Sequence, residues 1–129
     1  MSLRNSKSYK TLEAELEKRL VDKVTNLGGL AWKFTSQGTI GVPDRIILFC
    51  GKIFFVEMKA PGKDLREIQQ WRKHQLEREG FTVLRLRTME EVDEFVDSLV
   101  HAEIQSQRES ERRIAEIFGT KREGDWNAI

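Results

Sequence analysis

Two acidic residues and a lysine lie at the ends of two consecutive apolar segments. Asp44 directly precedes the segment 45–50, Glu57 ends the segment 52–57, and Lys59 follows two positions later. Acidic side chains rarely belong in buried apolar strands unless a positive group pairs with them. A divalent cation between the two carboxylates, with an ammonium group beside it, is such a pairing. This arrangement is suited to cutting phosphodiesters.

The two apolar segments predict adjacent strands of a hairpin, joined by a tight turn at 51–52, in a sheet covered on both faces. Glu57 and Lys59 would point to one face of their strand, opposite to Met58. Asp44, at the start of the neighbouring strand, would reach the same face. Two carboxylates and the main-chain carbonyl of Met58 would form an oxygen site that suits Mg²⁺ or Mn²⁺.

Such an ion would lower the pKa of a bound water and stabilise charge on phosphate oxygens, and Lys59 would hold the attacking water, the phosphate or both. Glu13 is a further candidate, because a helical wheel places it near the centre of a leucine stripe, with Glu15 on the opposite side. Glu13 would bind the metal through water or complete a second ion position. Alternatively, Glu13 only interacts favourably with the helix dipole.

The remaining segments predict the elements that position these residues. The apolar spacing and the caps predict four helices: over 8–27, over 65–79 with Asp64 as the N-cap, over the segment that follows the cap Thr88, and over 101–118. Further strands are predicted over 30–34 and 81–86, and a tail over 120–129. The order predicts an α/β fold in which helices flank a central mixed sheet, with a C-terminal helical extension.

The composition indicates one domain of modest size. Residues 1–100 are expected to form it, and residues 101–129 are expected to form a charged helix and tail that packs on it, serves a partner subunit or is loosely held. No apolar segment approaches the roughly 20 residues of a membrane span, and the first residues lack the pattern of a signal peptide, so a cytoplasmic location is expected.

Cys50 is the single cysteine of the 129 residues. It is expected in the core, and an internal disulfide or a cysteine-based zinc site is excluded.

The small net charge of +1 conceals an asymmetry along the chain. Residues 1–87 carry a net charge of +7, whereas residues 88–129 carry −6. A basic surface around an acidic site suits a polyanion that must approach a bound metal ion. The alternative is that the charges of both parts are simply solvated.

Four short motifs resemble the VRR-Nuc family, which belongs to the restriction-endonuclease-like PD-(D/E)xK superfamily. They are Gly-Val-Pro-Asp at 41–44, Val-Glu-Met-Lys at 56–59, Ala-Pro-Gly-Lys at 60–63 and Leu-Arg-Glu-Ile-Gln at 65–69, and the resemblance runs from about residue 12 to residue 96. It implies a restriction-endonuclease-like core and metal-dependent endonuclease activity, with Asp44 and Glu57 as metal ligands and Lys59 as the catalytic lysine.

The resemblance implies roles for two further residues. Gln69 matches the glutamine of the family's helix, which is expected to touch the metal-bound water or the phosphate, although Gln70 is an alternative. Glu13 matches the acidic residue of the first helix, as in the related archaeal Holliday junction resolvases. The chain is similar to the stand-alone bacterial and phage members, which look like junction resolvases and pair as homodimers.

The leading hypothesis is a metal-dependent, structure-selective DNA endonuclease of the Holliday junction resolvase type. A homodimer is expected because a four-way junction needs two symmetric cuts, with the helix around Trp71 or the strand edges as its interface. The alternatives are a less selective flap or duplex nuclease and a non-catalytic DNA-binding module. The candidate phosphate contacts are the cations near the site: Lys33, Arg45, Lys52, Lys63, Arg66, Arg72 and Lys73.

Overall fold

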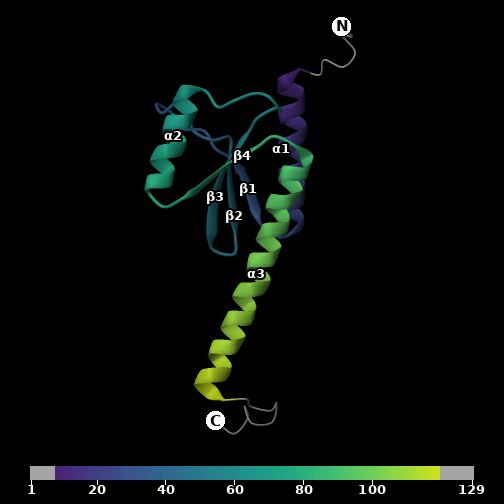
Figure 1. Cartoon of the computed structure of the whole chain (residues 1–129), viewed down its shortest axis with the longest axis vertical. Helices are drawn as coiled ribbons and strands as arrows, with labels where there is room; N and C mark the ends of the chain where they lie inside the picture. The colour runs from purple at the N-terminus through teal and green to yellow at the C-terminus, as the bar shows by residue number, and fades with distance from the viewer. Residues whose placement is uncertain (1–7, 120–129) are drawn as a thin grey trace. The chain divides into compact units, whose positions relative to one another are not determined.

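The computed structural model describes residues 8–119, which form three helices and four strands (Figure 1). In chain order these are α1 (Tyr9–Asn26), β1 (Leu30–Lys33), β2 (Arg45–Phe49), β3 (Lys52–Met58), α2 (Glu67–Arg78), β4 (Thr82–Leu86) and α3 (Met89–Phe118). The predicted α/β order is therefore confirmed. The tail expected over residues 120–129 lies outside the described residues.

The four strands form one mixed sheet in the order β1-β2-β3-β4. Strand β2 is antiparallel to both β1 and β3, whereas β4 runs parallel to β3. The connection from β3 to β4 therefore needs a crossover, which α2 provides. As a result, the end of β3 and the end of β4 lie at the same edge of the sheet as the start of β2.

The hairpin turn between β2 and β3 lies one residue earlier than the sequence suggested. Phe49 pairs with Lys52, so the two turn residues are Cys50 and Gly51, with φ values of 49° and 75°. Positive φ at both central positions is the requirement of a type I′ turn, whose twist matches that of the flanking strands. The expectation of a buried Cys50 is wrong, because the turn exposes this side chain.

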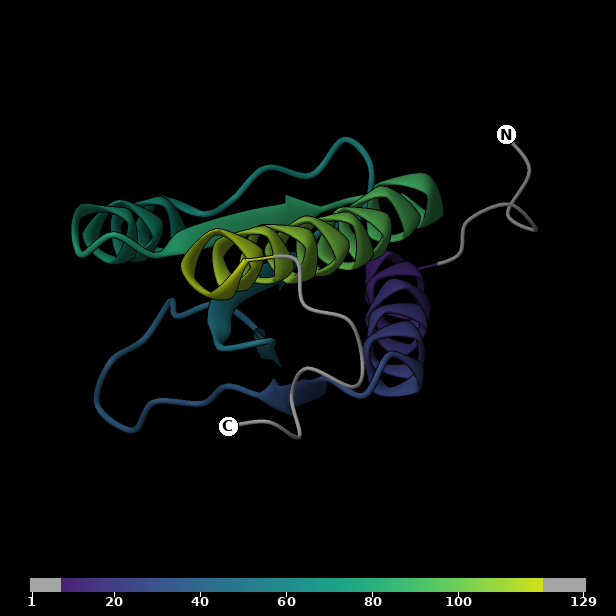
Figure 2. The same cartoon turned by 90° about the horizontal axis from the view of Figure 1, so that it is seen from below.

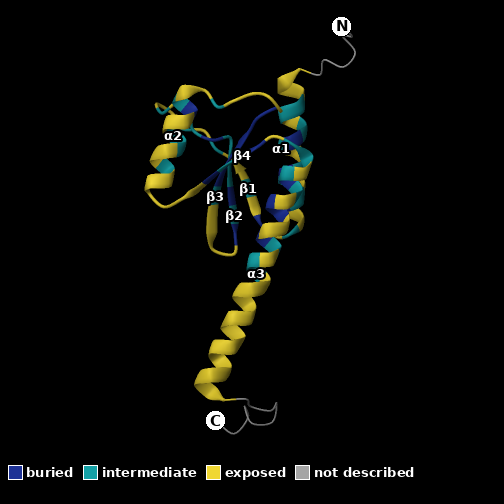
Figure 3. Cartoon of the chain, in the orientation of Figure 1, coloured by how far each residue is buried: buried dark blue, intermediate teal, exposed yellow. Residues whose placement is uncertain are grey.

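Helices α1 and α2 cover opposite faces of the sheet (Figures 1 and 2). The buried residues of α1 are Leu16, Leu20 and Val24, which belong to the predicted leucine stripe. The first turns of α3 share this side of the sheet, where the rings of Phe54 and Phe95 meet edge to face at 5.4 Å. Helix α2 is mostly exposed (Figure 3), and its only buried residue is Gln69. The main core therefore lies between the sheet, α1 and the start of α3.

Helix α3 differs from the prediction because it is continuous from Met89 to Phe118. Two helices had been expected, one after Thr88 and a second over 101–118. No glycine or proline interrupts the segment, so the backbone has no local reason to leave the helix. By its contacts the chain divides into two compact units, with the boundary between Asp97 and Ser98.

Candidate active site

The strand register places Asp44 opposite Glu57. The last residue pair between β2 and β3 is Arg45 with Val56, so the next opposing positions are Asp44 and Glu57, and their side chains leave the sheet on the same face. The carboxylate of Asp44 lies beyond the ladder, where its Oδ2 accepts a hydrogen bond from the Met58 N–H at 3.0 Å. The N–H and C=O of one strand residue point to the same neighbour. The Met58 carbonyl therefore also faces Asp44.

Glu57 is buried, Asp44 is half-buried, and the pKa of both carboxyl groups is raised. Burial is the main cause that raises the pKa of Glu57 to about 8, and the negative charge of Asp44 raises it further. Burial also raises the pKa of Asp44, although the hydrogen bond from Met58 opposes this shift. A carboxyl pair of this kind holds a proton when no other positive charge is present. The site is therefore short of positive charge.

Lys59 is a positive group that acts on both members of this pair. It is buried, at 7% exposure, and its charge lowers the pKa of both Glu57 and Asp44. Its main-chain N–H donates to the Leu86 carbonyl at 3.0 Å, which continues the pairing of β3 with β4 beyond the last strand residue. The lysine is thus fixed at the same end of the sheet as the two acids, as predicted.

Helix α2 brings Gln69, not Gln70, to the carboxylates. Gln69 Nε2 donates to Glu57 Oε2 at 3.3 Å, and its Oε1 accepts from the Arg66 N–H at 2.9 Å. Gln70 is exposed and donates to the Leu65 carbonyl instead. Because the amide oxygen of Gln69 is held by the backbone at the helix start, its NH₂ group is directed to Glu57.

The start of α2 also differs from the prediction. The N-cap position is Arg66, with the helix beginning at Glu67, whereas Asp64 had been expected as the cap. Gln69 reaches back to the Arg66 N–H and satisfies it from inside the helix. Asp64 is exposed and pairs with Arg85 at 3.1 Å.

Helix α1 contributes Glu13 and, unexpectedly, Glu17. Glu13 Oε2 lies 3.4 Å from the Ala60 N–H, and the Glu13 charge raises the pKa of Glu57. Glu13 therefore points to the end of β3, as the helical wheel indicated. Glu17 raises the pKa of Asp44. Sequence reasoning did not single out Glu17, although its spacing of four residues from Glu13 places both on one helix face.

The donor set fits a magnesium-like ion. Among the residues that the structure describes, no three or more His, Cys, Asp or Glu side chains form a metal-binding group. Mg²⁺, however, is commonly held by one or two carboxylates and completes its shell with waters and substrate phosphates. Asp44, Glu57 and the carbonyl of Met58 offer such a set of hard oxygens. The negative charge of the ionised pair is what a divalent cation would neutralise.

The predicted DNA-binding cations fall into two groups. Lys33, Lys63 and Arg66 are exposed, and Lys63 lies over the ring of Tyr9. The others have protein partners or lie away from the carboxylates: Arg45 Nε pairs with Glu17 at 3.3 Å, Lys73 pairs with Glu77 at 3.3 Å, Arg72 donates to the Ile40 carbonyl at 2.8 Å, and Lys52 stands at the far end of the hairpin. The first group is therefore the better placed for a polyanion.

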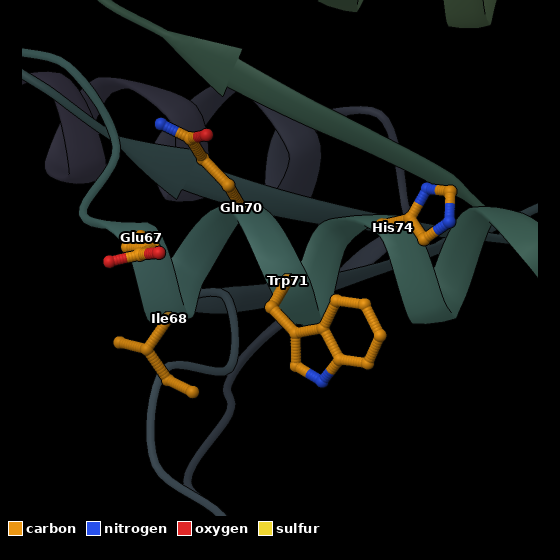
Figure 4. A pocket seen from close by; sticks show the side chains of 5 residues that line it. All are labelled: Glu67, Ile68, Gln70, Trp71 and His74. Atoms are coloured by element: carbon orange, nitrogen blue, oxygen red, sulfur yellow. The ribbon is translucent and has the colours of Figure 1, made fainter.

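A hollow of about 560 Å³ lies on the outer side of α2, and Glu67, Ile68, Gln70, Trp71 and His74 line it (Figure 4). The carboxylates of the candidate site are not among its lining residues. Figure 4 shows that Trp71 and Ile68 project from the same side of the helix. Trp71 is 51% exposed. Its predicted place in a dimer interface stays a prediction.

Comparison with known proteins places this geometry in a class. A solved structure described as "VRR_NUC domain" superposes with a TM-score of 0.62 at 26% sequence identity, over 66% of this chain and 94% of the other. The fold is thus a restriction-endonuclease-like α/β fold. Within that class the chain carries a VRR-Nuc domain, as its four motifs indicated.

A phage relative agrees with this assignment. "Putative nuclease p44" of Acyrthosiphon pisum secondary endosymbiont phage 1 is 56% identical over 52 residues, which are 40% of this chain and 56% of that protein. The matched segment spans just over half of the relative's length. No protein-family model matches the chain. None of the described helices has the length and apolar character that crossing a membrane requires.

Gly41 allows the loop before Asp44 to lie close to helix α2. Its φ is 84°, and a Cβ at this position would lie 2.8 Å from Ile68 Cγ1 and 3.1 Å from the Ile68 carbonyl carbon. The loop that leads to Asp44 therefore packs directly against the first turn of α2, one residue before Gln69. Only glycine combines this backbone conformation with this close approach.

Gly41→Ala is expected to destabilise the domain more than Gly38→Ala does. Gly38 has a nearly equal φ of 81° but open space around it, so the pair of variants separates backbone strain from the contact with Ile68. We expect an additional loss of about 1–3 kcal/mol for Gly41→Ala, measured by urea unfolding. Equal losses for the two variants would show that the close approach has no energetic consequence.

Glu57→Gln is expected to stabilise the metal-free protein at alkaline pH. The pKa of Glu57 is raised from 4.5 to about 8, so its contribution to stability is full below pH 4.5 and is lost as the pH rises to about 8. The variant lacks this loss and should be more stable by roughly 1–3 kcal/mol at pH 9 in EDTA. Urea unfolding at pH 5 and pH 9 measures the difference. Parallel pH dependences of the two proteins would contradict the burial of a titrating Glu57.

Proposed function

We propose that this chain is a metal-dependent DNA endonuclease. The observation that supports it best is the convergence of Asp44, Glu57 and Lys59 at one edge of the sheet, flanked by Gln69 and Glu13. The likeness to a VRR-Nuc structure and to a phage protein named as a nuclease is consistent with this reading. A non-catalytic binding module would have no need for a buried Glu57 whose pKa is raised by burial and by the neighbouring Asp44.

Asp44, Glu57 and the Met58 carbonyl would hold Mg²⁺ or Mn²⁺, with Glu13 reaching the ion through water. When bound, the ion would supply positive charge that stabilises the phosphate oxygens and lowers the pKa of a coordinated water. Charge neutralisation would also lower the cost of ionising both carboxyl groups, of which Glu57 is buried. Metal affinity should therefore rise with pH through the range in which Glu57 loses its proton.

The protein's own groups would orient the reactants. The Lys59 ammonium, beside both acids, would hold the attacking water or a phosphate oxygen. The NH₂ group of Gln69 would donate either to Glu57 or to the water. Water would attack phosphorus in line with the leaving 3′-oxygen, so the P–O3′ bond breaks and the product carries a 5′-phosphate, as the resemblance implies.

Binding to DNA would be largely independent of sequence. Lys33, Lys63 and Arg66 are exposed, and the first 87 residues carry a net charge of +7. Contacts of lysine and arginine with phosphates supply affinity and register, but they carry no information on base sequence. Selectivity would then come from the shape of the DNA.

We further propose that the substrate is branched DNA, with a four-way junction cut by a homodimer. A single chain has one such site, whereas resolving a junction needs two symmetric cuts. A two-fold dimer would place identical sites on two strands. Candidate interfaces are the outer face of α2 around Trp71 and the edge strand β1, where Trp32 is 57% exposed.

The assignment predicts metal-dependent cleavage that the acid pair and the lysine control. With labelled four-way junction, flap and linear duplex DNA, cleavage should require Mg²⁺ or Mn²⁺ and stop in EDTA. Asp44→Asn and Lys59→Ala should each lower the rate by at least about 10²-fold. Lys18→Ala is a suitable control, because Lys18 is exposed and pairs with Asp22 one turn further along α1.

Undiminished cleavage by Asp44→Asn or Lys59→Ala would overturn the proposed site. Calorimetric titration with Mn²⁺ adds an independent measurement, because a non-catalytic module should take up no ion that depends on Asp44. Equal rates on junction, flap and linear DNA would favour the less selective nuclease over the junction resolvase.

Trp32 and Trp71, which are exposed, allow a test of the dimer. The native protein is expected at twice the 15.1 kDa chain mass in light scattering after gel filtration. Trp71→Glu should yield monomers if α2 forms the interface, whereas Trp32→Glu should do so if the edge of β1 forms it, because a buried charge opposes association. A native protein that is monomeric at micromolar concentration with and without junction DNA would contradict a homodimer.

A further inference from the structure

An aromatic ring and a lysine meet beside the carboxylate cluster. Lys63 Nζ lies 5.1 Å from the ring centroid of Tyr9. Tyr9 is the first residue of α1, and 52% of it is exposed. The reaction proposed above assigns this tyrosine no role, although a half-exposed aromatic residue next to a candidate nuclease site is chemically suited to contact a nucleotide.

The backbone fixes both groups next to the site. Tyr9 and Glu13 are four residues apart in α1, so they lie on one helix face about 6 Å apart along the axis. Glu13 Oε2 approaches the Ala60 N–H, immediately after Lys59. The Lys63 N–H donates to the Ala60 carbonyl at 3.0 Å and closes a tight turn. Helix α1 through Glu13, and the turn at 60–63, therefore hold the Tyr9 ring and the Lys63 ammonium group next to the end of β3.

The turn that carries Lys63 is conformationally well defined. Its central residues are Pro61 and Gly62, and Gly62 has a φ of 83°, which is the combination of a type II turn. Ala60, its first residue, is fully buried. The lysine side chain is consequently presented from a constrained backbone, while its flexible stem lets the ammonium group move between the ring and another partner.

A nucleotide would compete well for both groups. Contact with an exposed aromatic ring favours the bound position of a lysine side chain only a few-fold. Stacking on an aromatic side chain raises the affinity for a base about five- to a hundredfold. A base that takes the face of the Tyr9 ring would displace the ammonium group from it. The adjoining phosphate would then give Lys63 a stronger, charged partner.

We propose that Tyr9 is a stacking platform for an unpaired nucleotide next to the scissile phosphate, and that Lys63 binds the phosphate of that nucleotide. This inference rests on the proposed function and names its substrate class, which is DNA with an unstacked base at a branch point or flap. Bases within a continuous duplex are stacked on one another and offer no free face to the ring. Tyr9 would therefore discriminate branched from linear DNA.

The experiment compares Tyr9→Phe, Tyr9→Leu and Tyr9→Ala in the cleavage-deficient Asp44→Asn background. Dissociation constants are measured for a flap and for a linear duplex of equal length, with 2-aminopurine as the unpaired base at the branch. The preference for the flap should fall about tenfold in the Leu and Ala variants, or about 1.4 kcal/mol, and persist in the Phe variant. Quenching of 2-aminopurine should accompany the preference, because stacking on the ring causes both.

A purely structural brace between α1 and the turn would give a different pattern. Tyr9→Ala would then lower the melting temperature and weaken binding to flap and duplex DNA equally, and this result would overturn the proposal. Retention of the full preference by Tyr9→Leu would also overturn it. The cleavage assay that compares the native chain with Asp44→Asn is separate from these binding measurements. If the preference for the flap depends on Tyr9 but the native chain does not cleave DNA, only the nuclease proposal is overturned.

Discussion

The proximity of a buried carboxyl group, Glu57, to the half-buried carboxyl group of Asp44 is the constraint on which the site depends. Asp44 and Glu57 share one end of the β2–β3 hairpin, where burial raises both pKa values, and the charge of Asp44 raises the pKa of Glu57 further. A fold selected for stability alone would place apolar side chains at such positions. The cost is offset within the protein only in part, by Lys59 and by the hydrogen bond from the Met58 N–H. A divalent cation would complete this compensation.

Three parts of the fold position the side chains around the two carboxyl groups. The hairpin register sets the separation of the acids, the first turn of α2 supplies Gln69, and the first half of α1 supplies Glu13. The contact between Gly41 and Ile68 then joins the loop before β2 to α2. The side chains of the site therefore depend on helix–sheet packing and not on the hairpin alone, so changes distant in sequence will displace them.

Much of the fold and of the candidate site could be predicted, because the hydrophobic periodicity and the positions of the charged residues in the sequence were informative. Apolar strands that end in acids located Asp44 and Glu57, and a helical wheel gave the direction of Glu13. The errors arose where several local choices were permitted. Cys50 occupies a turn because the hairpin register requires positive φ there, and Asp64 lost the N-cap position because Gln69 satisfies the Arg66 N–H. Glu17 was missed because its influence on Asp44 acts through space between α1 and β2.

The electrostatics also imply an order of events at the site. Glu13, Asp44 and Glu57 together would repel a phosphate, although the first 87 residues as a whole carry a net charge of +7. Long-range attraction therefore brings DNA to the surface, whereas close approach requires a positive charge between the acids. Metal and DNA should accordingly bind with positive coupling, because each lowers the electrostatic cost of the other. The same acids that make the empty site unfavourable for DNA would thus confine tight binding to the metal-loaded protein.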